Sequence, residues 1–158
     1  MHSVPEACET GSYIDRTAVY HHTRKLYWAD ARRIQFTARV LAYLEADRPA
    51  IVLNRTLFYP TSGGQPHDTG ALGGERVVDV QQQDGQILHY VDKLPSPSRE
   101  LAGAIDWQRR WDHMQQHSGQ HLLSAGFLTL SNRPTIGFHL SADTVTIDLP
   151  GSMPDHSE

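Results

Sequence analysis

The stretch from Trp107 to Leu128 constrains the fold more than any other part of the chain. Its small and apolar residues recur at steps of three and four, which places side chains on one face of a helix. This stripe consists of Trp107, Trp111, Met114, Ser118, Leu122, Ala125 and Thr129. Asp106 stands just before the pattern and can cap the first turn. The sequence therefore predicts a long helix that begins near Trp107 and turns this stripe toward the interior.

Two histidines, His117 and His121, lie beside the stripe and four positions apart. One helical turn stacks such a pair on the same side, where two imidazoles can hold one metal ion, most often zinc. The alternative is a chance spacing, because the chain contains 10 histidines. His113, four residues earlier, is expected to be solvated. Ser118 stands where zinc proteases carry glutamate after the first histidine, which excludes standard zinc-protease chemistry.

Composition limits the class of protein. The 158 residues are enough to bury the core of one domain or two small ones. We expect a cytoplasmic protein without a membrane partner, because there is no long apolar run or signal peptide and Cys8 is the single cysteine. The net charge of −4 gives no overall basic field, so RNA binding needs a local patch. Arg99, Arg109 and Arg110 are candidates for such a patch, although a few arginines are more often a solvated face.

The pattern along the chain divides it into three parts. Residues 1–24 have no period and are expected to be a loose extension. Residues 25–95 predict a small antiparallel β-barrel-like domain, with alternation over 34–44 and a hairpin turn at Asp84-Gly85. After a linker at 94–98, residues 99–158 contain a possible short strand, the long helix and two further strands. The predicted class is α+β: a small antiparallel β-barrel followed by an incomplete α+β domain built on one long helix.

The segment 55–74 is dense in Gly, Pro, Ser, Thr and Asp, and it predicts a loop with tight turns. Within it, Gly63 and Gly64 allow another group to approach the backbone closely. A purely structural turn is the alternative interpretation of this glycine pair.

Four segments taken together carry a resemblance to a known family. They are FYPTSGGQPHDTGAL at 58–72, DGQILH at 84–89, IDWQRRWDHMQQHSGQHLLSA at 105–125 and TVTIDL at 144–149. The residues of these segments and their order along the chain resemble the free-standing alanyl-tRNA editing proteins of the AlaX type. Those proteins are relatives of the editing domain of alanyl-tRNA synthetase. The resemblance runs from about Lys25 to Leu149, and the glycine motif followed by HxxxH makes it specific.

The resemblance implies a zinc-dependent trans-editing hydrolase that serves translation fidelity. Such proteins deacylate tRNA(Ala) mischarged with serine or glycine, so the implied partner is the mischarged acceptor end of tRNA and the implied cofactor is Zn²⁺. The first two zinc ligands would be His117 and His121. The implied catalytic residues are Ser118, which keeps a hydroxyl near the metal, and Gln120, and the implied substrate-binding residues are Gly63 and Gly64.

The sequence departs from the family at the second half of the zinc site. The family completes this site with a downstream Cys-x-x-x-His pair, which these 158 residues lack. Asp155 and His156 are the candidate replacements. His139 can face the pocket, although a structural histidine in a strand is the favoured interpretation. We therefore expect half of a catalytic domain with exposed apolar faces and little or no hydrolysis by the chain as it stands. The alternative function is a truncated, non-catalytic relative that acts at most as a weak tRNA- or partner-binding module.

Overall fold

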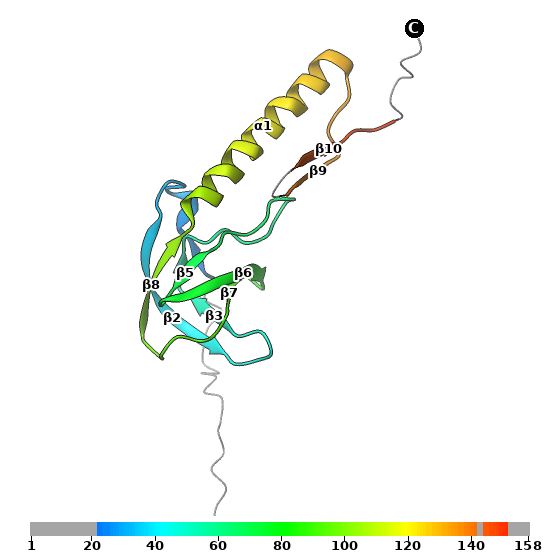
Figure 1. Ribbon diagram of the computed structural model, residues 1–158. Coiled ribbons are helices and arrows are strands. Elements are labelled where there is room, and N and C mark those ends of the chain that lie inside the picture. The colour runs from blue at the N-terminus through cyan, green and yellow to red at the C-terminus, as the bar shows by residue number, and fades with distance from the viewer. Residues whose placement is uncertain (1–21, 142–143, 152–158) are drawn as a thin grey trace, which may run out of the picture.

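The structure is a computed structural model that describes residues 22–141 and 144–151 (Figure 1). Most of the predicted extension, 1–24, lies outside the described residues. Its last part packs on the barrel, because Thr23 is buried and its hydroxyl donates to the Leu53 carbonyl at 3.0 Å. Over the described ranges, no helix combines the length and apolar character needed to cross a membrane.

Most of the described residues belong to regular elements. In chain order these are β1 (Arg24–Lys25), the 3-10 helix η1 (Leu26–Trp28), β2 (Gln35–Leu44), β3 (Ala50–Leu53), β4 (Arg55–Thr56), β5 (Gly70–Leu72), β6 (Glu75–Gln83), β7 (Gln86–Val91), β8 (Glu100–Ile105), α1 (Trp107–Ser131), β9 (Gly137–Leu140) and β10 (Val145–Asp148). The predicted α+β class is confirmed. The segment 55–74, predicted as loop, also contains the short strands β4 and β5, because its two ends pair with neighbouring strands.

Six strands pair in the order β2-β3-β7-β6-β5-β8, and β8 pairs back with β2 to close a barrel. The alternation predicted for β2 holds at its start, where Phe36 and Ala38 are buried between exposed neighbours. Strand β8 lies in the range 99–158 that the sequence assigns to the second unit, yet it pairs with β2 and β5 and so belongs to the barrel. The linker at 94–98 therefore connects two barrel strands.

The hairpin predicted at Asp84-Gly85 is confirmed between β6 and β7. Both turn residues have positive φ, 48° for Asp84 and 79° for Gly85, as a two-residue turn of the hairpin type requires. This turn fixes the register in which β6 and β7 pair.

A neutral histidine lies at the centre of the barrel core. The ring of His89 is fully buried; its Nδ1 donates to the Ile51 carbonyl at 3.0 Å, and its Nε2 lies 2.8 Å from the Thr56 hydroxyl. Burial lowers the pKa of His89 to about 4, and the hydrogen bond to Ile51 opposes that shift only in part. The ring is therefore uncharged in the folded protein at neutral pH.

The free energy of unfolding is expected to fall as the pH drops from about 6.5 to 4. The unfolded chain binds a proton at His89 in this window and the folded chain does not, so His89 contributes stability that is complete above pH 6.5. The loss attributable to His89 is about 3 kcal/mol, from about 1.4 kcal/mol per pKa unit. Urea unfolding at pH 7 and 4.5 measures it, with His89→Gln as the control. An equal pH dependence in the control would contradict this assignment.

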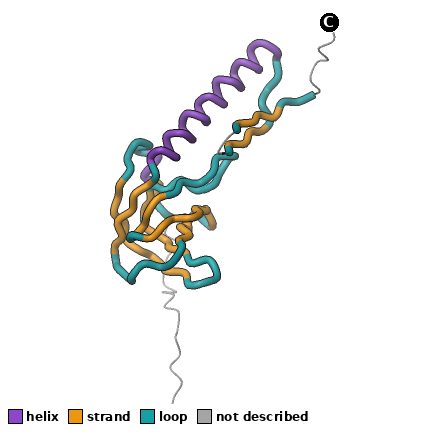
Figure 2. The backbone as a smooth tube through the Cα atoms, viewed as in Figure 1, coloured by secondary structure: helices purple, strands orange, loops and turns teal. Residues whose placement is uncertain are grey.

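Helix α1 begins as predicted, because the Asp106 side chain accepts a hydrogen bond from the Arg109 backbone N–H at 3.2 Å. It projects from the barrel, and the hairpin of β9 and β10 runs beside it (Figures 1 and 2). The helix ends at Asn132, which takes the left-handed conformation with a φ of 51°.

The predicted inward face of α1 is wrong. The buried helix residues are Arg110, His113 and Gln120, whereas Trp111 and Leu122 of the predicted stripe are exposed. The reason is that the helix is anchored to the barrel through polar side chains, which apolar periodicity does not reveal. The expectation of exposed apolar surface is confirmed by Leu122 and Leu130, which are 77% and 89% exposed.

Candidate functional site

The two predicted metal-binding histidines lie together on α1. The Nε2 atoms of His117 and His121 are 2.9 Å apart, and the ring centroids are separated by 4.7 Å. Burial lowers the pKa of His117 below its ordinary value, and the neighbouring His121 lowers it further. His117 is therefore neutral at pH 7 and can offer a nitrogen lone pair.

Gln65 holds the first of these rings from the opposite side. This residue is 8% exposed, and its Oε1 accepts a hydrogen bond from His117 Nδ1 at 3.0 Å. A donor hydrogen on Nδ1 leaves the lone pair on Nε2, the atom that faces His121. Sequence reasoning missed Gln65; its position directly after Gly64 was the available signal.

The loop between β4 and β5, residues 57–69, carries Gly63 and Gly64 and is called the glycine loop below. It runs out from the barrel to strand β9 and so reaches the histidine pair (Figure 2). The Gly64 carbonyl accepts from the Leu140 backbone N–H at 3.0 Å, and the Phe138 ring meets His117 edge-on at 5.5 Å. Gly64 has a φ of +79°, and a Cβ on it would collide with the Phe138 carbonyl. Only glycine fits this close approach, so the glycine pair here does more than form a turn.

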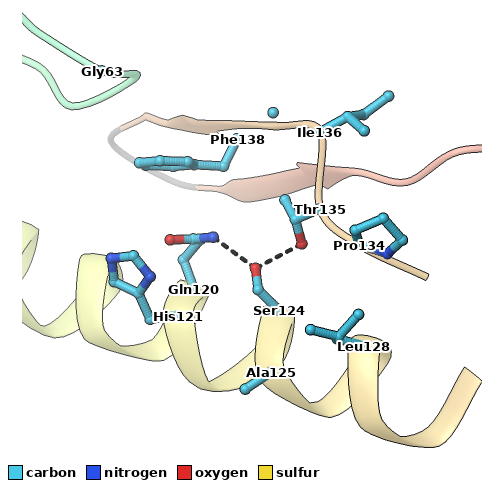
Figure 3. Close-up of a pocket in the computed structure, with 11 residues that line it drawn as sticks. Gly63, Gln120, His121, Ser124, Ala125, Leu128, Pro134, Thr135, Ile136 and Phe138 are labelled. Atoms are coloured by element: carbon cyan, nitrogen blue, oxygen red, sulfur yellow. Dashed lines mark hydrogen bonds between the residues drawn. The ribbon is translucent and has the colours of Figure 1, made fainter. Parts of the chain in front are cut away.

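A pocket opens between α1, the glycine loop and β9, and its lining includes Gly63, Gln120 and His121 (Figure 3). Its volume is about 740 Å³. Within it, the Ser124 hydroxyl accepts hydrogen bonds from Gln120 Nε2 and from the Thr135 hydroxyl, both at 2.7 Å. The pocket therefore combines an apolar wall with a small polar cluster beside the histidine pair.

The structure does not bring Ser118 to this pocket. Ser118 is exposed, and its hydroxyl donates to the Met114 carbonyl of its own helix at 2.9 Å. One residue on from His117, the helix has rotated by about 100°, so adjacent side chains face different directions. Of the implied site residues, Gly63, Gly64, His117, Gln120 and His121 come together and Ser118 does not.

A buried ion pair joins α1 to the glycine loop. Arg110 donates to both carboxylate oxygens of Asp68, and its Nη2 donates to the Leu57 carbonyl at 2.7 Å. Asp68 also accepts from the Tyr59 backbone N–H at 2.6 Å. The proposed RNA-binding patch is therefore wrong for Arg110, because this guanidinium is buried and paired with Asp68.

His113 also differs from expectation, because it is buried rather than solvated. Burial lowers its pKa, and the neighbouring Arg109 guanidinium lowers it further. Arg109 itself donates from Nε to the His67 carbonyl at 3.0 Å, so this part of α1 is tied to the same loop.

The described residues contain no group of three or more His, Cys, Asp and Glu side chains placed to hold a metal ion. His139 is exposed, its Nε2 lies 3.6 Å from a carboxylate oxygen of Asp148, and it forms no metal-holding group with the pair on α1. The other candidates, Asp155 and His156, lie outside the described residues. Within the described ranges, the potential metal ligands of this site are therefore two imidazoles.

Comparisons with known proteins agree with the motifs. Residues 12–109 match the family model described as tRNA synthetases class II (A). An alanine–tRNA ligase of Pyrobaculum neutrophilum is 39% identical over 138 residues, 84% of this chain and 15% of the ligase. The alanyl-tRNA editing protein AlaX-L of Pyrococcus horikoshii is 34% identical over 137 residues, 82% of this chain and 34% of AlaX-L.

A vertebrate relative, the alanyl-tRNA editing protein Aarsd1 of Danio rerio, is 38% identical over 109 residues, 65% of this chain and 26% of Aarsd1. The chain thus spans about a third or less of the length of these curated relatives. The predicted resemblance to alanyl-tRNA editing proteins is confirmed. Because the family model covers more than half of the chain, this chain belongs to the class II (A) tRNA synthetase family, with alanyl-tRNA editing proteins among its relatives.

Proposed function

We propose that this chain forms part of a zinc-dependent site that deacylates tRNA(Ala) mischarged with serine or glycine. The observation that carries the proposal is the position of His117 and His121, with Nε2 atoms 2.9 Å apart, beside a glycine loop and a pocket. The names of the relatives, an alanine–tRNA ligase and two alanyl-tRNA editing proteins, support the substrate class. The proposed partner is the mischarged acceptor end of tRNA.

The two histidines fit two corners of a zinc site. Two imidazole nitrogens bound to one tetrahedral zinc ion at about 2.0–2.1 Å lie about 3.3 Å apart, close to the 2.9 Å between these Nε2 atoms. Gln65 supports the same fit, because it holds the Nδ1–H of His117 as outer-shell partners of zinc ligands do. Zinc sites take at least three protein ligands, so we propose that the others come from groups outside the described residues.

A bound zinc ion would supply a Lewis acid for the ester carbonyl and lower the pKa of a bound water. The chain itself supplies orientation and enclosure. Gln65 fixes the ring of His117, and the polar cluster of Gln120, Ser124 and Thr135 offers hydrogen bonds to a bound aminoacyl group. The terminal nucleotides of tRNA are single-stranded, so they enter such a pocket without opening a duplex.

The small number of metal ligands among the described residues favours a second candidate function. With two imidazoles as its only described metal ligands, the site on this chain can also belong to a non-catalytic module that binds tRNA or a partner protein weakly. This alternative predicts tRNA binding without release of the amino acid.

Release of serine from Ser-tRNA(Ala) tests the proposal. With zinc supplied, the protein is expected to release serine slowly but faster than spontaneous hydrolysis, and a chelator is expected to return the rate to the spontaneous one. Ala-tRNA(Ala) is the control substrate and should remain acylated. Hydrolysis that a chelator does not change contradicts the zinc dependence. No release above background with zinc present, together with retained tRNA binding, favours the non-catalytic alternative.

A further inference from the structure

We infer that three exposed arginines form a binding surface for the phosphate backbone of RNA: Arg39 on barrel strand β2, and Arg24 and Arg55 on the small β1–β4 sheet beside it. We call this set the basic patch. The inference rests on the proposed function only in its choice of tRNA as the RNA. It concerns a surface formed by β2 and the adjoining β1–β4 sheet rather than the pocket on α1.

The three arginines gather around one residue, Asn54. Arg24 and Arg55 are register partners in the parallel pair of β1 and β4, so their side chains leave the same side of that pair. Arg39 exchanges hydrogen bonds with Asn54, whose Oδ1 accepts from the Arg39 backbone N–H at 2.8 Å. The Arg55 side chain extends toward β2, the strand that carries Arg39, because its Nε donates to the Thr37 carbonyl of β2 at 2.8 Å.

The charges of the basic patch are not neutralised. Within residues 22–141 and 144–151, none of the three guanidinium groups forms an ion pair. Glu100 is the register partner of Arg39 on β8, yet it makes no ion pair with it. Like charges on paired strands cost stability, and the chain as a whole has a net charge of −4. A cluster of unpaired cations on an acidic protein is therefore better explained by an anionic partner than by folding.

The chain leads from the basic patch to the start of α1. Strand β1 continues into η1, where the residue Trp28 is 77% exposed and Lys25 Nζ lies 4.6 Å from the centroid of its ring. Just beyond, the Ala31 carbonyl accepts from Arg110 Nη1 of α1 at 3.1 Å. An exposed aromatic ring beside a cation suits the stacking of an unpaired base. The patch and this ring form one route for an RNA strand toward the helix that carries the histidine pair.

Binding of uncharged tRNA(Ala), measured by fluorescence anisotropy at several salt concentrations, tests the inference. The test variant replaces all three patch residues with glutamine. Its dissociation constant is expected to rise about tenfold or more at low salt. The slope of the logarithm of the association constant against log[salt] should become less negative by about 2–3, since each lost phosphate contact removes about 0.7–0.9 from its magnitude.

A control with the same change in net charge removes three cations outside the basic patch, two of which are ion-paired, Arg48 with Asp79 and Lys93 with Glu75. It combines Arg48→Gln, Arg76→Gln and Lys93→Gln, and its dissociation constant should change less than twofold. Equal weakening by both variants, no weakening by the patch variant, or no tRNA binding by the unmodified protein would overturn the inference. If only the patch variant binds tRNA more weakly, the inference stands even when the unmodified protein releases no serine. That combination of results contradicts only the proposed hydrolysis.

Discussion

Replacing Asp68 with alanine is expected to lower the free energy of unfolding by about 3–5 kcal/mol, a large share of the stability of a domain this size. The change leaves the Arg110 guanidinium buried without its carboxylate partner and removes the acceptor of the Tyr59 N–H. A buried charge without a partner costs far more than the pair contributes. Urea unfolding followed by circular dichroism measures the loss.

Two further variants make this result specific. The double change Asp68→Leu with Arg110→Met removes both charges, so it is expected to be more stable than Asp68→Ala alone. Glu100→Ala removes an exposed carboxylate and should change the free energy of unfolding by no more than about 0.5 kcal/mol. A loss below about 1 kcal/mol for Asp68→Ala would mean that the ion pair does not hold α1 on the barrel.

Replacing His117 with alanine is expected to weaken zinc binding about 100-fold or more. Loss of an outer-shell partner of a zinc ligand costs about 10–100-fold, and loss of the ligand itself costs at least as much. His117 also links the two sides of the site, because its Nδ1 donates to Gln65 and its Nε2 faces His121. Competition with a chromophoric chelator measures the affinity of the purified protein for zinc.

The control for this experiment is His139→Ala, which removes an exposed histidine that is paired with Asp148 rather than with α1. Its zinc affinity should equal that of the unmodified protein. If His117→Ala binds zinc as tightly as the unmodified protein, the assignment of this residue as a ligand is refuted.

Local rules predicted the features whose causes lie within a few residues. The cap at Asp106 and the turn at Asp84-Gly85 follow from side-chain and backbone preferences at single positions. The closeness of His117 and His121 on one side of the helix follows from the helical repeat alone. The meeting of the glycine loop with this pair followed from the family resemblance, because no local rule links positions so far apart.

The features that sequence reasoning missed depend on contacts between distant segments. Asp68 and Arg110 are 42 residues apart, and their pairing decides which face of α1 is buried. Gln65 and His117 are 52 residues apart, so the hydrogen bond that orients the ring has no local signature. The apolar stripe misled for the same reason, because a helix held by buried polar contacts does not need to bury its apolar residues.

The central claim is that His117 and His121 hold one zinc ion together, and X-ray absorption at the zinc edge tests it most directly. The protein loaded with one equivalent of zinc should show two imidazole nitrogens at about 2.0–2.1 Å from the metal. The His121→Ala variant should show one fewer. A spectrum without imidazole scattering, or one that His121→Ala leaves unchanged, would contradict the claim.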